Sequence, residues 1–185
     1  MIREILIWPD PVLKKVSRPA ERVDDTVRRL LDDMSETMYA ADGVGLAAPQ
    51  IGELRRCVVI DTSPRQEGQK LIHFVNPQIV RAEGTTTYTE GCLSIPGEAE
   101  DVDRAAKVWV QALDYAGKPF EIECDGLLAI AVQHELDHLE GTLFVDHISS
   151  LKREIIRRHM KRLKAERQTE SPEEIRRAPA HRSAL

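Results

Sequence analysis

His134-Glu135-Leu136-Asp137-His138 is the stretch of sequence that decides the fold. Two histidines four residues apart lie on one face of a helix, so both imidazoles can reach a single metal ion. Glu135 stands beside the first histidine, where it can take a proton from a metal-bound water. The residues at 127–132 are all apolar, which predicts a buried helix over residues 127–139. Polar groups carried into an interior need partners, and a metal ion supplies them.

Upstream of this helix the chain is rich in strand patterns. Short β-branched, Thr/Tyr-rich or alternating runs predict strands at residues 57–60, 71–75, 85–90, 107–113 and 120–124. The turn residues between the last two runs favour a β-hairpin. Apolar residues at helical spacing predict a helix over residues 24–41, capped by Asp24 or Asp25, and Asp10-Pro11 starts a short one. The sequence therefore predicts an α+β fold, with mixed or antiparallel sheets packed around a central metal-binding helix.

Composition narrows the class of protein. The 185 residues carry a formal net charge of −5 at pH 7 and are 42 % hydrophobic, which suits one globular domain. No apolar run reaches the ~20 residues that cross a bilayer, and the first residues do not resemble a secretion signal. The three cysteines are odd in number and widely spaced, unlike a disulfide framework. We expect a cytoplasmic, reduced, soluble protein that binds neither membranes nor DNA.

The C-terminal part has two sections. Residues 151–164 form an apolar stripe opposite a basic face, with seven Lys or Arg and one Glu, a net charge of +6. We expect residues 1–164 to be a single catalytic domain that ends in this basic amphipathic helix. Residues 165–185 lack periodicity, and we expect a disordered tail. The basic face is either simply solvated or a contact for an anionic partner.

A catalytic metal site usually has three protein ligands and one open position, so a third ligand is needed. The zinc-peptidase pattern HExxHxxGxxH fails here, because Phe144 stands where its last histidine belongs. Glu154 lies within the basic helix and is a poor candidate, and His147 stays open. Cys57 and Cys124 lie in apolar runs typical of buried structural cysteines. Cys92 instead follows a strand in a bend rich in Gly and Pro, where its thiolate can complete a Cys/His/His set.

Three segments together resemble the signature motifs of peptide deformylases. They are Gly43-Val44-Gly45-Leu46-Ala47-Ala48-Pro49-Gln50, Glu90-Gly91-Cys92-Leu93-Ser94-Ile95-Pro96-Gly97 and Gln133-His134-Glu135-Leu136-Asp137-His138. Their order and approximate spacing are those of the family, and the likeness extends from the N-terminus to about residue 164. The resemblance implies a metal-dependent hydrolase that removes the N-formyl group from the N-terminal formyl-methionine of new polypeptides and releases formate.

The resemblance also implies roles for individual residues. Cys92, His134 and His138 hold one Fe²⁺ per chain, for which Zn²⁺, Ni²⁺ or Co²⁺ can substitute. A metal-activated water attacks the formyl carbon, with Glu135 as general base and then general acid. The Gln50 side-chain amide and the backbone N–H of Leu93 stabilise the developing oxyanion.

For substrate binding, the family implies main-chain hydrogen bonds to an extended peptide and an apolar pocket for the methionine side chain. The main-chain contacts fall at Val44, Gly45 and Gly91. The pocket is lined by Tyr88, Leu127, Ile130 and Ala131, with Glu90 nearby. Ala131 departs from many relatives, which carry cysteine there, so the pocket can be slightly roomier.

The sequence leaves two alternative functions for the metal site open and suggests one macromolecular partner. An endopeptidase built on the same helix would not need Cys92. A closed structural site would take Cys57 or Cys124 as its fourth ligand. Since deformylases act on chains that emerge from the ribosome, the basic helix at residues 151–164 is a candidate contact for ribosomal RNA.

Overall fold

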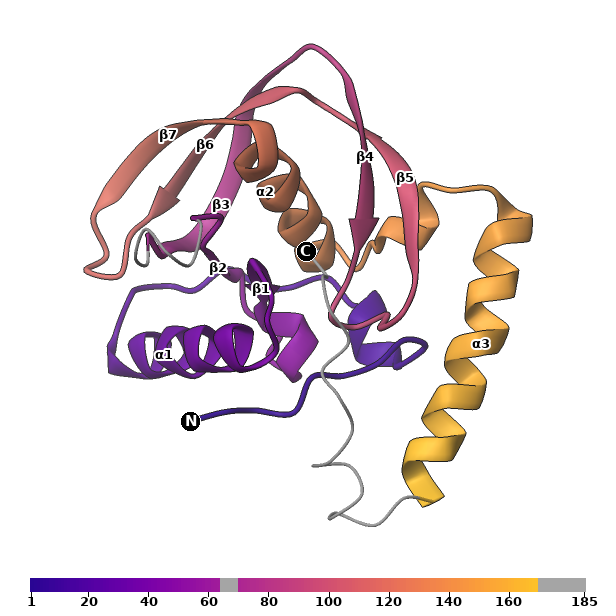
Figure 1. Ribbon diagram of the computed structural model, residues 1–185. Helices are drawn as coiled ribbons and strands as arrows, with labels where there is room; N and C mark the ends of the chain where they lie inside the picture. Colours follow the sequence, from indigo (N-terminus) through magenta and orange to yellow (C-terminus); the bar gives the residue numbers. More distant parts are fainter. Residues whose placement is uncertain (64–69, 170–185) are drawn as a thin grey trace.

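The computed structural model describes residues 1–63 and 70–169 of the chain (Figure 1). Its helices and strands are, in order, α1 (Asp25–Ala40), β1 (Gly45–Ala47), β2 (Cys57–Ile60), β3 (Ile72–Glu83), β4 (Thr86–Gly91), β5 (Ala99–Arg104), β6 (Lys107–Leu113), β7 (Pro119–Asp125), α2 (Gly126–Leu139) and α3 (Ser150–Thr169). A short 3-10 helix at Pro11–Lys14 follows Asp10, whose carboxylate accepts from the Val12 N–H. No helix of the described part of the chain is long and apolar enough to span a membrane.

The strands form two antiparallel sheets. The larger has the order β1-β2-β3-β6-β7, and β4 pairs with β5 in a separate ribbon. In Figure 1 the larger sheet curves over α2 on one side, and β4 and β5 lie on the other. The predicted α+β fold around a central helix is confirmed.

The pleat of β2 explains how the two faces of the sheet are used. Val58 and Ile60 belong to the apolar cluster that holds α2 against the sheet. Cys57 and Val59 point the other way, into the cluster formed with α1. Every residue of β2 is buried, because α2 packs on one face of the strand and α1 on the other.

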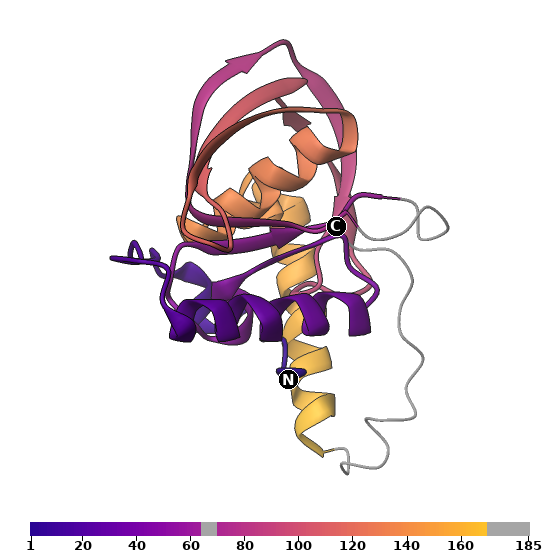
Figure 2. The same cartoon turned by 90° about the vertical axis from the view of Figure 1, so that its left-hand side faces the viewer.

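The predicted helix at 24–41 is confirmed as α1, and Asp24 is its cap: the carboxylate accepts from the backbone N–H groups of Thr26 and Val27. The basic helix is longer than predicted. α3 continues to Thr169, so the expected disordered tail is wrong for residues 165–169, and residues 170–185 lie outside the described part. Figure 2 shows α3 projecting past the body of the molecule, to which it is fixed by buried Ile156 and Met160.

Three stretches of strand were not predicted. β1 and β5 had no strand signal in the sequence, and β3 runs eight residues beyond Val75, to Glu83. The Asn76-Pro77 pair is typical of a turn. In the structure it forms an irregularity inside the strand instead, since Asn76 has a positive φ of 54° and the pairing with β6 shifts register there.

Candidate metal centre

Cys92, His134 and His138 are brought together although 42 residues separate the first from the second. Their ligand atoms all lie within 4.8 Å of one another. Cys92 Sγ is 3.3 Å from His138 Nε2, and the two imidazole rings are 5.1 Å apart. The histidines come from α2, and Cys92 follows β4 in a turn closed by the Ile95 N–H donating to the Cys92 carbonyl. All three side chains are buried, so the cluster is screened from bulk water.

Glu90 orients the first histidine. Its Oε2 lies 2.9 Å from His134 Nδ1, so the proton of the neutral ring belongs on Nδ1 and Nε2 turns toward Cys92. Burial alone would raise the pKa of Glu90, but Arg104 and His134 outweigh it and lower the pKa to about 2. The carboxylate therefore stays ionised beneath the ring.

The donor set fits a divalent transition metal. His134 Nε2 is buried and has no hydrogen-bond partner, which is what a nitrogen reserved for an ion requires. Burial lowers the pKa of His138 well below its ordinary value and keeps that ring neutral. At His134 burial acts the same way, but Cys92 and Glu90 outweigh it and raise the pKa, so a proton and a metal ion compete for Nε2. One thiolate with two imidazoles suits Fe²⁺ or Zn²⁺ and disfavours Ca²⁺ or Mg²⁺.

The other candidate ligands lie elsewhere. Cys57 and Cys124 are buried in separate apolar clusters, and burial raises the pKa of their thiols to about 12 and about 11. A closed site with either as a fourth ligand is therefore wrong. His147 stays outside the cluster, with its Nε2 2.7 Å from Asp137 Oδ2. Glu154 forms ion pairs on the surface of α3.

Glu135 lies close to His134, and one oxygen of its buried carboxylate has no hydrogen-bond partner. It is 1 % exposed, Oε2 has no hydrogen-bond partner, and burial raises its pKa to about 7. An acid with a pKa near neutrality can both accept and return a proton at physiological pH. Gly45 makes room for it: a Cβ built there would lie 3.0 Å from Glu135 Cδ and closer still to Oε1. The carboxylate of Glu135 can therefore occupy this position only because residue 45 has no side chain.

Gln50 is held with its amide nitrogen toward the cluster. Its Oε1 accepts from the Ala47 N–H at 2.8 Å, so Nε2 points the other way, 3.7 Å from Cys92 Sγ and 3.2 Å from Ser94 Oγ. Leu93, the residue after the cysteine, packs its side chain against Gly43, where a Cβ would collide with it. These contacts hold Gln50 and the Cys92–Leu93 backbone in fixed positions around the site.

The residues expected to bind substrate are spread over two environments. β1, with Val44 just before Gly45, is the edge strand of the larger sheet, and Gly91 ends β4. Of the four expected pocket residues, Ile130 and Ala131 of α2 are buried in the core, Leu127 is partly buried, and Tyr88 is 40 % exposed. Both oxygens of Glu90 are engaged by His134 and Arg104, so its carboxylate lies beneath the metal ligands.

Arg104 is the important residue that sequence reasoning missed. It ends β5, is 7 % exposed, and donates Nε and Nη2 to the two oxygens of Glu90 at 2.6 and 2.9 Å. Burial opposes its charge, but Glu90 and Asp137 outweigh that cost and raise its pKa. No motif marked it, because its function depends on which strand lies beside β4.

A buried Cys/His/His cluster, with a neutralisable acid and an amide donor beside it, defines a mononuclear metal-dependent hydrolase. Residues 2–154 match the profile of the family described as polypeptide deformylase. The chain is 52 % identical over 162 residues to a peptide deformylase of Alkalilimnicola ehrlichii, covering 88 % of this chain and 90 % of that one. It is 53 % identical over 154 residues to one of Phenylobacterium zucineum, covering 83 % and 91 %.

Solved structures agree with these relatives. A peptide deformylase from Legionella pneumophila superposes with a TM-score of 0.86 at 48 % identity, covering 92 % of this chain and 100 % of that chain. One from Ehrlichia chaffeensis, in complex with actinonin, gives 0.83 at 36 %, covering 92 % and 99 %. The chain belongs to the peptide deformylase family: it is a metal-dependent enzyme that removes the N-formyl group from new polypeptides. This membership overrules the endopeptidase alternative.

Proposed function

We propose that Cys92, His134 and His138 hold one Fe²⁺ ion and that Glu135, Gln50 and Leu93 carry out the deformylation around it. The observation that carries this is the convergence of three buried ligand atoms beside a buried carboxylate whose pKa is about 7. When bound, the ion supplies Lewis acidity and brings the pKa of a water ligand toward ~7. Glu135 accepts a proton from the attacking water and later returns it to the departing amine.

The oxyanion that develops on the formyl oxygen needs donors besides the ion. The Gln50 amide is the first proposed donor, because its oxygen is bound to the Ala47 N–H and its nitrogen is thereby turned toward Cys92 and Ser94. The backbone N–H of Leu93 is the second proposed donor. Donors that are fixed before the reaction cost no reorganisation when the charge appears.

The substrate peptide is proposed to lie along β1. This strand pairs with β2 on one side, which leaves its other edge for a strand added through Val44 and Gly45, with Gly91 opposite. Main-chain pairing of this kind accepts many sequences after the first residue. The methionine side chain is proposed to enter between Tyr88, Leu127, Ile130 and Ala131. Glu90 acts beneath the site, through His134.

The experiment that tests the function compares formyl-Met-Ala-Ser with its unformylated form, using protein prepared without air. Formate and free amine should appear in equal amounts from the first peptide and not from the second. Glu135→Ala should abolish formate release and leave the metal content unchanged. Internal cleavage of either peptide, or formate release by Glu135→Ala at the rate of the unchanged protein, would contradict the proposed function.

Iron as the working ion is tested separately. A thiolate beside Fe²⁺ is sensitive to oxidation, so activity should be lost in air with iron and kept with nickel or cobalt. Equal air sensitivity with all three ions would contradict the assignment of iron.

The basic face of α3 is proposed to contact ribosomal RNA in the cytoplasm, where new chains emerge. Arg158 and Arg162 suit a test, because their side chains are 78 % and 72 % exposed and do not support the core. Reversing both to Glu should weaken cosedimentation with ribosomes and reduce its dependence on salt. Reversal of Arg22 and Arg29, both exposed on the body, changes the net charge equally and is the matched control. Equal loss with the control would exclude a specific role for α3.

A further inference from the structure

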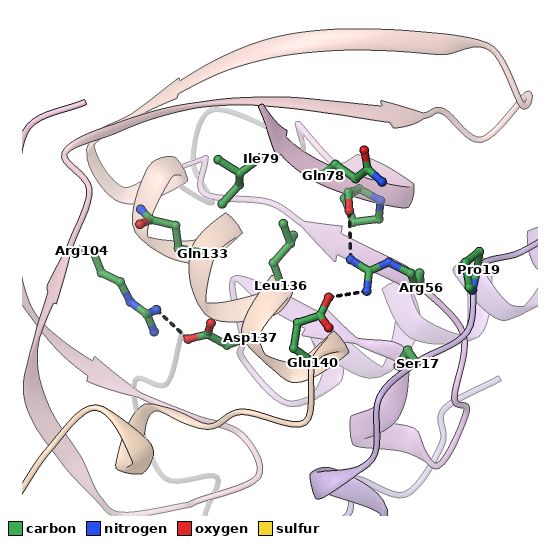
Figure 3. A pocket seen from close by; sticks show the side chains of 11 residues that line it. Ser17, Pro19, Arg56, Gln78, Ile79, Arg104, Gln133, Leu136, Asp137 and Glu140 are labelled. Carbon is green, nitrogen blue, oxygen red and sulfur yellow. Dashed lines mark hydrogen bonds and ion pairs between the residues drawn. The ribbon is translucent and has the colours of Figure 1, made fainter. Parts of the chain in front are cut away.

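A cluster of charged side chains lies behind the metal centre, on another face of α2. A cavity of about 700 Å³ lies there, lined by Arg104 and by one face of α2 (Figure 3). The residues of that face, spaced three or four apart, are Gln133, Leu136, Asp137 and Glu140. In Figure 3 the guanidinium of Arg104 points toward Asp137 across this cavity. The distance from Arg104 Nη1 to Asp137 Oδ2 is 2.6 Å.

His147 extends this cluster to the surface. Its Nε2 lies 2.7 Å from the same Asp137 oxygen that Arg104 contacts. The side chains of His147 and Asp137 are 35 % and 24 % exposed, whereas those of Arg104 and Glu90 are 6 % and 0 % exposed. A continuous chain of hydrogen bonds therefore begins at the surface and ends at Nδ1 of His134.

We propose that Asp137 and His147 are positioning residues for the metal centre, acting through Arg104 and Glu90 on His134. A guanidinium is planar, with its donors in a fixed fork. Asp137 holds one arm of the fork, so the plane in which the other donors meet Glu90 is set from outside the site. His147 in turn holds the Asp137 carboxylate. The outer partners of a metal-binding histidine fix its orientation and its strength as a ligand.

The charges explain why the outer pair is needed. Arg104 is a single buried cation between two carboxylates, Glu90 and Asp137. With Asp137 neutralised, one arm of the guanidinium loses its ionic partner, and the fork can tilt away from Glu90. With His147 removed, the Asp137 carboxylate can rotate toward solvent in the cavity. Either change loosens His134 without touching a ligand atom.

The test uses three variants and a control in the full chain loaded with Co²⁺, whose absorption reports ligand geometry. In Asp137→Asn and His147→Phe the visible spectrum should shift, and transfer of the metal to a chelator should be about tenfold faster. In His147→Gln, whose side-chain amide can still donate to Asp137, both should return toward the values of the unchanged protein. His159→Phe is the matched control, since His159 also contacts a carboxylate, Glu98, but lies outside the chain that leads to His134.

The outcomes are separable. Unchanged spectra and release rates in folded Asp137→Asn and His147→Phe would overturn the inference, as would an equal change in His159→Phe. If Asp137→Asn does not fold, the comparison of His147→Phe with His147→Gln is sufficient, because His147 is partly exposed and its replacement leaves the core intact. The inference rests on the proposed metal centre. If the unchanged protein gave no cobalt–thiolate spectrum, that centre itself would fail, whatever the variants showed.

Discussion

Replacing Glu135 by glutamine should make the metal-free protein more stable above pH 7 while it abolishes deformylation. The carboxylate is 1 % exposed, its Oε2 has no partner, and burial raises its pKa from 4.5 to about 7. A shift of that size corresponds to about 3 kcal/mol between the two protonation states. Glutamine has the shape of the protonated acid and never pays this cost of a buried charge.

The sign of the pH dependence follows from the direction of the shift. Because the pKa in the folded protein lies above its ordinary value, the folded protein binds more protons than the unfolded chain between pH 4.5 and about 7. The stability of the Glu135 protein therefore falls as the pH rises through that interval. Below pH 4.5 the difference in free energy of unfolding between Glu135→Gln and the unchanged protein should not vary with pH. By pH 8 this difference should have grown by about 3 kcal/mol in favour of Glu135→Gln.

Urea unfolding of chelator-treated protein from pH 4 to pH 8.5 measures this difference. Glu90 provides the opposite control, since it is equally buried but its pKa is lowered to about 2 by Arg104 and His134 against the effect of burial. Its charge stabilises the fold above pH 4.5 and loses that effect as the pH falls toward 2, so Glu90→Gln should destabilise at pH 8. A pH-independent difference for Glu135→Gln, or a loss of stability at pH 8, would refute the reasoning.

Three further predictions test the site. Gly45→Ala should lower turnover about 100-fold with the metal retained, because its Cβ displaces Glu135; steady-state formate release and metal analysis measure both, and normal turnover would contradict it. Gln50→Leu should retain the metal but lose ~10²–10³ in turnover, so near-normal rates in the same assay would count against an oxyanion role. Cys92→Ser should release the metal to a chelator and Cys57→Ser should not, and equal retention would exclude Cys92 as a ligand.

Local patterns were sufficient for α1, for α2 and for the two metal-binding histidines. The i, i+4 histidines and the apolar run before them identify α2 and its burial without further information. Asp24 identifies the start of α1 in the same way. Cys92 was harder, because its place beside the histidines depends on tertiary contacts, and only the residues around it distinguished it from Cys57.

β5 shows what local patterns could not supply. Asp101 and Asp103 are poor strand formers, so no local pattern predicted a strand there. In the structure these acids point to solvent, and Thr89 and Thr87 of β4 donate hydrogen bonds to them across the ribbon. The pairing itself is the stabilising factor, and it is visible only after β4 and β5 are known to be neighbours. Arg104 was missed for the same reason.

The charges around α2 show how stability is distributed between the two sides of this helix. On one side Arg104 lies between Glu90 and Asp137, so each carboxylate has an ion pair with the same buried cation. On the other, Glu135 Oε2 and His134 Nε2 are left without partners in the interior. Such groups destabilise a fold unless a ligand satisfies them, and they persist where function requires them. The structure thus holds His134 in place from behind with a satisfied network, so that its unsatisfied nitrogen can face the site.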